Sequence, residues 1–120
     1  MKRGIILRSD INRIKVIVDE LLSNAVNSDS TNIDINVSRS KDTITIKVVD
    51  NGKGMDKETL EKAKERLNHS YRKDFEEYYG QLAGKQISHG GLTIVGMQVN
   101  EAEIESSKGE GTTVTVKKER

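Results

Sequence analysis

Two short stretches in which apolar and polar residues alternate constrain the fold of this chain more than any other feature. Side chains of a strand point alternately to its two faces, so residues 33–37 and 44–48 each predict a strand with one buried face. The apolar members are Ile33, Ile35, Val37, Ile44, Ile46 and Val48. Because the polar stretch 38–42 between them predicts a turn, we expect an antiparallel hairpin with one face on a core and the other in solvent.

The stretch before this hairpin has the period of a helix. Its apolar residues recur at intervals of three and four, which predicts an amphipathic helix ending near Asn27. They are Ile11, Ile14, Val18, Leu21, Leu22 and Ala25. Glu20 and Asn24 are one helical turn apart, and both project from the edge of the apolar stripe. The two side chains can therefore face a site beside the core, although a solvated glutamate and a surface asparagine fit the same spacing.

The second predicted strand ends in the heptapeptide Asp50-Asn51-Gly52-Lys53-Gly54-Met55-Asp56, and a helix is predicted after it at Lys57–Asn68. Gly52 and Gly54 lack Cβ and permit φ > 0, so the main chain there can approach a flat or phosphorylated ligand and offer free N–H groups. A carboxylate at Asp50 would face a pocket or water. An ordinary Asn-Gly turn is the alternative, and the heptapeptide alone favours that alternative.

Three further elements complete the predicted fold. Residues 91–97 predict a short helix, and its glycine-rich start can receive phosphates through free N–H groups and the positive end of the helix dipole. Residues 102–106 and 113–116 predict two strands, which a glycine turn at 108–111 connects.

The segment at about residues 69–90 is the least regular part of the chain. It holds every aromatic residue, at a spacing that places the rings on one side of a short helix; they are Tyr71, Phe75, Tyr78 and Tyr79. These rings fit either ordinary core packing or a surface for docking a partner. Because glycines flank residues 81–88, we predict a mobile lid within this segment.

Composition limits the classes of protein to which the chain can belong. A length of 120 residues predicts one domain, at residues 1–120, with a single core. The formal net charge of +1 gives no electrostatic footprint for nucleic acid or for an anionic membrane. The apolar run at residues 4–7 is too short for a signal peptide or a membrane span. We therefore expect a cytoplasmic protein that neither binds nucleic acid nor inserts into a membrane.

Four segments, in this order, resemble the motifs of the GHKL superfamily of ATP-binding domains, which includes DNA gyrase, heat-shock chaperones, mismatch-repair ATPases, histidine kinases and anti-sigma serine kinases. Residues 20–25 are similar to its helix box, 50–55 to its first glycine box, 90–95 to its second and 109–114 to its closing box. The resemblance implies a Bergerat fold, an α/β (α+β) two-layer sandwich with a mixed, mostly antiparallel sheet covered on one face by helices.

The resemblance also implies a site for ATP and Mg²⁺. Asp50 would accept a hydrogen bond from the adenine amino group, Thr112 would support a bridging water, and Gly54 would let the base lie against backbone. Asn24 would hold Mg²⁺, and Glu20 would be the general base. The other glycine-box residues implied to line the nucleotide are Gly52, Met55, Gly91 and Leu92.

The second glycine box departs from the pattern of the family at its start, where this chain has His89 and Gly90. The exact phosphate contacts therefore stay open, including whether His89, Lys53 or Lys85 takes part in them.

Two functions fit these features. The first is a protein kinase module that transfers the γ-phosphoryl group of ATP to a partner protein, as anti-sigma serine kinases and the catalytic domains of histidine kinases do. The alternative is a non-catalytic module that docks a partner protein according to whether ATP or ADP is bound. A homodimer is compatible with either function. The sequence does not distinguish the serine kinase subtype from the histidine kinase subtype.

Overall fold

A computed structural model describes residues 8–68 and 91–120 of the chain. Its elements are α1 (Arg8–Asn27), β1 (Ile33–Arg39), β2 (Thr43–Asp50), α2 (Lys57–Leu67), α4 (Gly91–Gln98), β3 (Glu101–Ser106) and β4 (Thr112–Glu119). Each helix and strand predicted within these ranges is present, with ends shifted by a few residues at most. The predicted lid at residues 69–90, with its aromatic residues, Lys85 and His89, lies outside the described residues.

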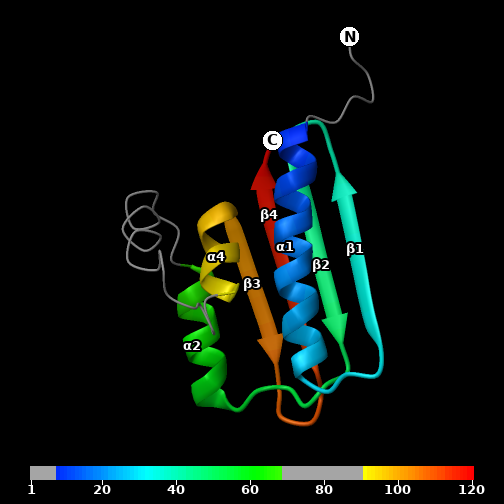
Figure 1. Ribbon diagram of the computed structural model, residues 1–120. Helices are drawn as coiled ribbons and strands as arrows, with labels where there is room; N and C mark the ends of the chain where they lie inside the picture. Colours follow the sequence, from blue (N-terminus) through cyan, green and yellow to red (C-terminus); the bar gives the residue numbers. More distant parts are fainter. Residues whose placement is uncertain (1–7, 69–90) are drawn as a thin grey trace, which may run out of the picture.

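The four strands form one sheet in the order β1-β2-β4-β3 (Figure 1). All three neighbouring pairs are antiparallel, and β1 and β2 form the predicted hairpin. The expectation was a mixed, mostly antiparallel sheet, and the four strands of the described residues are antiparallel throughout. The two outer pairs, β1 with β2 and β3 with β4, are joined by short turns, and such turns can connect only antiparallel strands.

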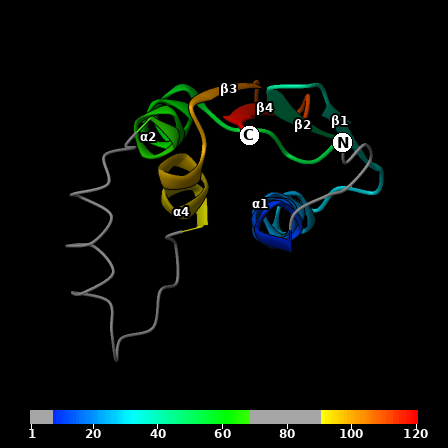
Figure 2. The ribbon, with the colours of Figure 1, turned by 90° about the horizontal axis from the view of Figure 1, so that it is seen from above.

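The helices lie on one side of this sheet, which gives the two-layer α+β arrangement that was expected. Figure 2 shows α1 and α4 beneath the sheet, with α2 beside α4 at the β3 edge. The core between the layers consists of Ile17, Leu21, Ile44, Ile46, Val48, Ala63, Leu67, Leu92, Val95, Val99, Ile104, Val114 and Val116. Alternate residues of β2 and β4 supply much of it, as the period of two predicts.

The buried face of α1 is rotated from the predicted one. Ile17 was not assigned to the apolar stripe, yet it is only 1% exposed, whereas Ile11 and Leu22 of the predicted stripe are 38% and 37% exposed. Because α1 packs against α4 as well as against the sheet, its buried arc turns toward α4. The same rotation brings the edge of α1 that carries Glu20 to the start of α4.

Candidate functional site

The first part of the site lies at the end of β2, where the residues that face the core change from apolar side chains to a carboxylate. Asp50 has the same parity along β2 as Ile46 and Val48, so it points to the helix-covered side, and it is 6% exposed. In the sheet register, Asp50 lies opposite Thr112 of β4, and Thr112 lies opposite Ser106 of β3. Three polar side chains therefore form one row across the end of the core.

One oxygen of the Asp50 carboxylate is committed to the local turn. Oδ1 accepts a hydrogen bond from the backbone N–H of Gly52 at 2.8 Å, which fixes the direction of the side chain. The other oxygen has no hydrogen-bond partner among residues 8–68 and 91–120. It is therefore available to accept a hydrogen bond from a ligand.

Ser106 joins the heptapeptide to β4, a role that the sequence analysis missed. Its Oγ accepts the N–H of Met55 at 2.8 Å, donates to the carbonyl of Gly111 at 3.0 Å and lies 2.8 Å from Oγ1 of Thr112. Because the single proton of Ser106 goes to Gly111, Thr112 is the donor in the hydroxyl pair. The lone pairs of Thr112 remain free for a water, as the expected water network requires. The sequence did indicate this role, because Ser106 is a polar residue two positions after the buried Ile104 and so lies on the same face of the strand.

The two glycines of the heptapeptide have different reasons to lack a side chain. Gly54 has a φ of +71°, and a Cβ there would overlap the carbonyl of Ser107, so both the conformation and the space exclude other residues. At Gly52, which has no positive φ, a Cβ would meet Ser28. Among the described residues, Ser28 and the backbone carbonyl of Ser107 thus occupy the space that side chains at these two positions would need.

The second part of the site is a pocket of about 220 Å³ at the meeting point of α1, α2 and α4. It brings together the predicted Glu20, Asn24, Gly91 and Leu92. The complete lining is Glu20, Ser23, Asn24, Asn27, Arg66, Gly91 and Leu92. A Cβ at position 91 would lie 2.5 Å from Oε1 of Glu20, so this carboxylate sits against the first residue of α4. The positive end of a helix dipole favours a negative group at that position.

Arg66 is the other residue of this pocket that the sequence analysis missed. It is half-buried, and it reaches the pocket from the last turn of α2. The absence of a side chain at Gly96 lets α4 pack closely against the end of α2, because a Cβ at this position would lie 2.6 Å from the backbone oxygen of Arg66. This close packing brings Arg66 to the pocket. A guanidinium here can hold two oxygens of one phosphate group.

The loop after α1 ties the two parts of the site together. Ser28 follows Asn24 by one turn and accepts the N–H of Lys53 with its carbonyl, at 2.9 Å. The side chain of Lys53 forms an exposed ion pair with Asp29, 3.6 Å from Nζ to Oδ2. Through these contacts, the loop after α1 connects the pocket around Glu20 to the turn that follows Asp50.

Asp56 ends the heptapeptide and caps α2. Its Oδ1 accepts the backbone N–H of Thr59 at 2.8 Å. This hydrogen bond, with the nearby positive charges of Lys108 and Lys62, lowers the pKa of Asp56.

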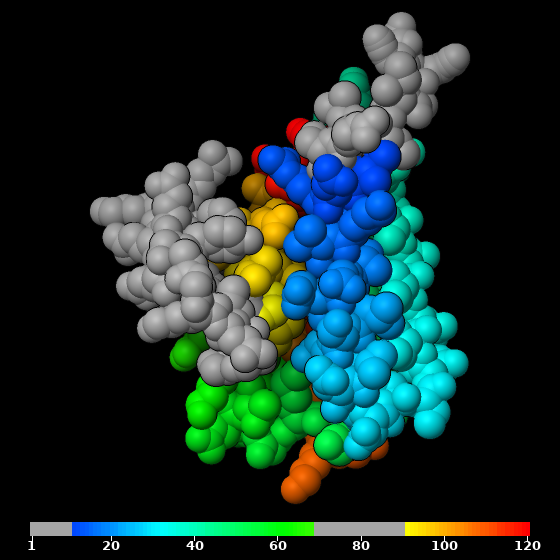
Figure 3. All heavy atoms as spheres, viewed as in Figure 1, coloured from blue at the N-terminus to red at the C-terminus, as the bar shows by residue number. Residues whose placement is uncertain are grey.

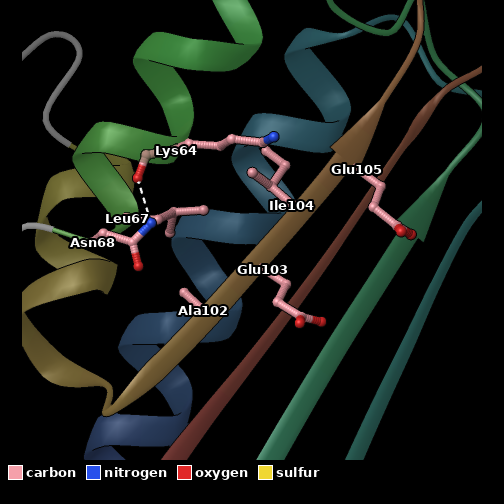
Figure 4. A pocket seen from close by; sticks show the side chains of 7 residues that line it. All are labelled: Lys64, Leu67, Asn68, Ala102, Glu103, Ile104 and Glu105. Carbon is pink, nitrogen blue, oxygen red and sulfur yellow. Dashed lines mark hydrogen bonds between the residues drawn. The ribbon is translucent and has the colours of Figure 1, made fainter.

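A pocket of about 290 Å³ between α2 and β3 contains none of the predicted site residues (Figure 4). Figure 4 shows Glu103 and Glu105 projecting from β3, while the side chain of Asn68 donates to the carbonyl of Lys64 at 2.8 Å. The predicted site residues therefore lie around Glu20 and Asp50 and not in this pocket.

Taken together, the antiparallel four-stranded sheet and the helices on one side of it form an α+β domain compatible with the Bergerat-type ATPase fold. The chain matches the family model of histidine kinase-, DNA gyrase B- and HSP90-like ATPases over residues 9–120, and it belongs to this family of GHKL ATP-binding domains. No curated protein matched the chain. In the part of the chain that the structure describes, no helix combines the length and the apolar character that crossing a membrane requires.

The donor set of the 220 Å³ pocket fits Mg²⁺, which ATP domains of this family usually use. Asn24, Asn27 and Glu20 offer amide and carboxylate oxygens, the hard ligands that this cation prefers. Mg²⁺ typically takes one or two protein ligands and completes its shell with phosphate and water oxygens. The residues that are present therefore suffice.

Proposed function

We propose that this domain is a protein kinase module that transfers the γ-phosphoryl group of ATP to a hydroxyl or imidazole group of a partner protein. The observation that carries the proposal is the pocket in which Glu20, Asn24 and Arg66 meet the first residue of α4. A carboxylate base, a cation ligand and a phosphate ligand around one small space are the groups that phosphoryl transfer needs. The proposal places the domain in the cytoplasm, where ATP and Mg²⁺ are available.

In this proposal the row across the end of the sheet holds the adenine. The free oxygen of Asp50 accepts a hydrogen bond from the exocyclic amino group, and Thr112 accepts one from a water that bridges to the base. Met55 is held beside them by its hydrogen bond to Ser106. Guanine has a carbonyl where adenine has its amino group, so Asp50 would face an acceptor and disfavour GTP.

The pocket around Glu20 holds the phosphates. Asn24 binds the Mg²⁺ that neutralises phosphate charge, and Arg66 and the N–H groups at Gly91 and Leu92 contact phosphate oxygens. For a hydroxyl acceptor, Glu20 removes the proton as the acceptor oxygen bonds to the γ-phosphorus and the bond from phosphorus to the β,γ-bridging oxygen breaks. The products are ADP, the phosphorylated partner and a protonated Glu20.

A second function is supported by the contact between Glu20 and the start of α4. Phosphates at Gly91 would compete with the Glu20 carboxylate for the same helix end, so bound ATP and ADP would leave different arrangements of α1 and α4. A partner that reads this difference would make the domain a nucleotide-dependent docking module without phosphoryl transfer.

Glu20→Gln separates the two functions. It keeps the size of the side chain and removes the base, so ATP affinity by calorimetry should stay within about threefold while ADP formation, with water as the acceptor, falls by about 100-fold or more. Glu65→Gln, an exposed change on α2, is the matched control. If wild type forms no ADP above the rate of Glu20→Gln, although both bind ATP, transfer to a hydroxyl acceptor with Glu20 as the base is excluded and the docking function is favoured.

A further inference from the structure

The hydroxyl of Ser106 has three partners, and the chemistry of two of them cannot be reversed. The backbone N–H of Met55, at 2.8 Å, can only donate, and the carbonyl of Gly111, at 3.0 Å, can only accept. The single proton of Ser106 therefore points to Gly111, and one of its two lone pairs takes the N–H of Met55. The second lone pair is left for the hydroxyl of Thr112, 2.8 Å away.

The direction of this hydroxyl pair determines what Thr112 can offer to a ligand. Its own proton is used on Ser106, so toward any other group its oxygen can only accept. A threonine hydroxyl without such a partner can rotate and serve either as a donor or as an acceptor. Ser106 thus converts Thr112 from an adaptable group into a fixed acceptor.

This fixed acceptor lies beside the carboxylate of Asp50. Thr112 and Asp50 are directly opposite each other on β4 and β2, and both are buried on the helix-covered side of the sheet. Side chains at such positions have Cβ atoms ~4.5–5.5 Å apart, so the edge of one ligand, with a bridging water, can contact both. An ionised carboxylate is also an acceptor only, so the two side chains together require donors.

The end of β3 holds the Ser106 hydroxyl in this position. Ser106 is the last residue of the strand and lies opposite Thr112 in the register with β4. The turn after it also binds the heptapeptide, because the N–H of Gly109 donates to the carbonyl of Lys53 at 2.6 Å. Figure 3 shows this turn (orange) at one end of the molecule, beside the end of α1 and the start of α2. The heptapeptide is therefore joined to this part of the chain at two points, Met55 and Lys53.

We propose that Ser106 is a positioning residue for recognition of the base, a role that rests on the proposed adenine site. A water on Thr112 must give one of its protons to the Thr112 oxygen, and the amino group of adenine donates to the free oxygen of Asp50. The second proton of the water is then presented to the ring nitrogen N1, which is an acceptor in adenine but carries a proton in guanine and hypoxanthine. Ser106 acts through Thr112 and the water, and in this way the site selects an acceptor at position 1 of the purine ring.

A purely structural role for Ser106 predicts a different result. If its hydroxyl only joined Met55 to β4, its loss would weaken the binding of every adenine-like nucleotide to the same extent. A positioning residue instead sets how much of the affinity comes from the contact with the ring nitrogen. The ratio of the affinities for two bases therefore distinguishes the two roles, whereas the affinity for ATP alone does not.

Two analogues of ATP separate the two contacts of the base. In 1-deaza-ATP a C–H group replaces the ring nitrogen N1 and the amino group is kept, whereas purine riboside triphosphate keeps N1 and lacks the amino group. We expect each analogue to bind wild type about tenfold more weakly than ATP by calorimetry, because each loses one hydrogen bond to a buried group. The first penalty reports the contact through Thr112, and the second reports the contact with Asp50.

Ser106→Ala should lower the 1-deaza penalty to about threefold or less, because Thr112 can then rotate and the water is no longer held with a proton toward the ring. The penalty for the missing amino group should stay within about twofold of its wild-type value, since Asp50 is unchanged. Ser106→Thr keeps the hydroxyl and should restore the 1-deaza penalty. Ser107→Ala, an exposed change at the next residue, is the matched control and should alter neither penalty.

Thr112→Val tests the same contact without a change at Ser106. It removes the acceptor, so the 1-deaza penalty should again fall, and Ser106→Ala added to it should lower that penalty no further. Circular dichroism verifies that each variant is folded. If Ser106→Ala does not fold, an unchanged 1-deaza penalty in Thr112→Val overturns the proposal.

The outcomes separate this proposal from the proposed function. An unchanged 1-deaza penalty in folded Ser106→Ala, whether or not ATP itself binds more weakly, would overturn the positioning role and leave nucleotide binding established. A wild type that binds no ATP would overturn the adenine site and the positioning role together.

Discussion

Asp50 and Thr112 lie directly opposite each other on β2 and β4, on the side of the sheet that the helices cover. Toward the other end of both strands, this row of positions is filled by buried Ile and Val. The pair therefore marks the point where the core ends and a polar site begins.

Asp50→Asn should weaken ATP binding while leaving the turn in place. The Asn side-chain oxygen can still accept the N–H of Gly52, but the carboxylate oxygen that we propose as the acceptor for adenine is lost. We expect a loss of about 1.5–3 kcal/mol, or about tenfold or more in Kd, by calorimetry. Asp34→Asn, on exposed β1, should leave the Kd unchanged. Equal affinity of Asp50→Asn and wild type for ATP would exclude Asp50 from adenine recognition.

Arg66→Ala should reduce the affinity for ATP and ADP but not for adenosine, because Arg66 lines the pocket proposed for the phosphates. Loss of a charge-assisted hydrogen bond predicts roughly a tenfold increase in the Kd of ATP. Arg66→Lys should recover part of the affinity, since it keeps the charge without the planar fork. Lys64→Ala on the same helix is the control. An equal loss for adenosine would mean that Arg66 supports the fold and not the phosphates.

Gly54→Ala should destabilise the domain by at least ~1–3 kcal/mol, the usual cost of a strained φ, with a further loss from overlap with the carbonyl of Ser107. Gly109→Ala is a matched control, because Gly109 also has a positive φ, of +82°, but no atom within 4 Å of the added Cβ. Urea unfolding of both variants separates strain from overlap. If the two variants unfold at the same urea concentration, the contact with Ser107 contributes nothing.

The cap at Asp56 should make stability depend on acid pH. Its pKa is lowered in the folded state, so the ionised form stabilises the fold above the ordinary pKa of about 4, and this contribution is lost as the pH falls through the lowered value. Asp56→Asn keeps a good cap without the charge. Its Tm should lie below that of wild type at neutral pH, and the two should converge in strong acid. Glu65→Gln should not show this convergence, and a constant difference for Asp56→Asn would exclude ionisation as the cause.

The sequence was sufficient for the hairpin, because a period of two leaves little choice about which face a strand residue takes. It left open whether the Asp50 carboxylate faces a pocket or water, and the structure shows this residue to be 6% exposed. It was not sufficient for Arg66. The helix Lys57–Leu67 carries six charged residues besides Arg66, at Lys57, Glu58, Glu61, Lys62, Lys64 and Glu65, and only its packing on α4 decides which one reaches the pocket. Ile17 was missed for a related reason, since the buried arc of α1 depends on the position of α4.

The parity of β2 has a consequence for how this site can change in evolution. Asp50 points to the helix-covered side only because it follows the buried Val48, Ile46 and Ile44 by two, four and six positions. Inserting one residue between Val48 and Asp50 without a compensating bulge would turn the carboxylate to the solvent face. The sequence of such a chain would still contain the glycine motif, yet its Asp side chain could no longer contact an adenine on the helix-covered side. In this chain, the count of residues from the strand to the motif is as important for the proposed adenine contact as the motif itself.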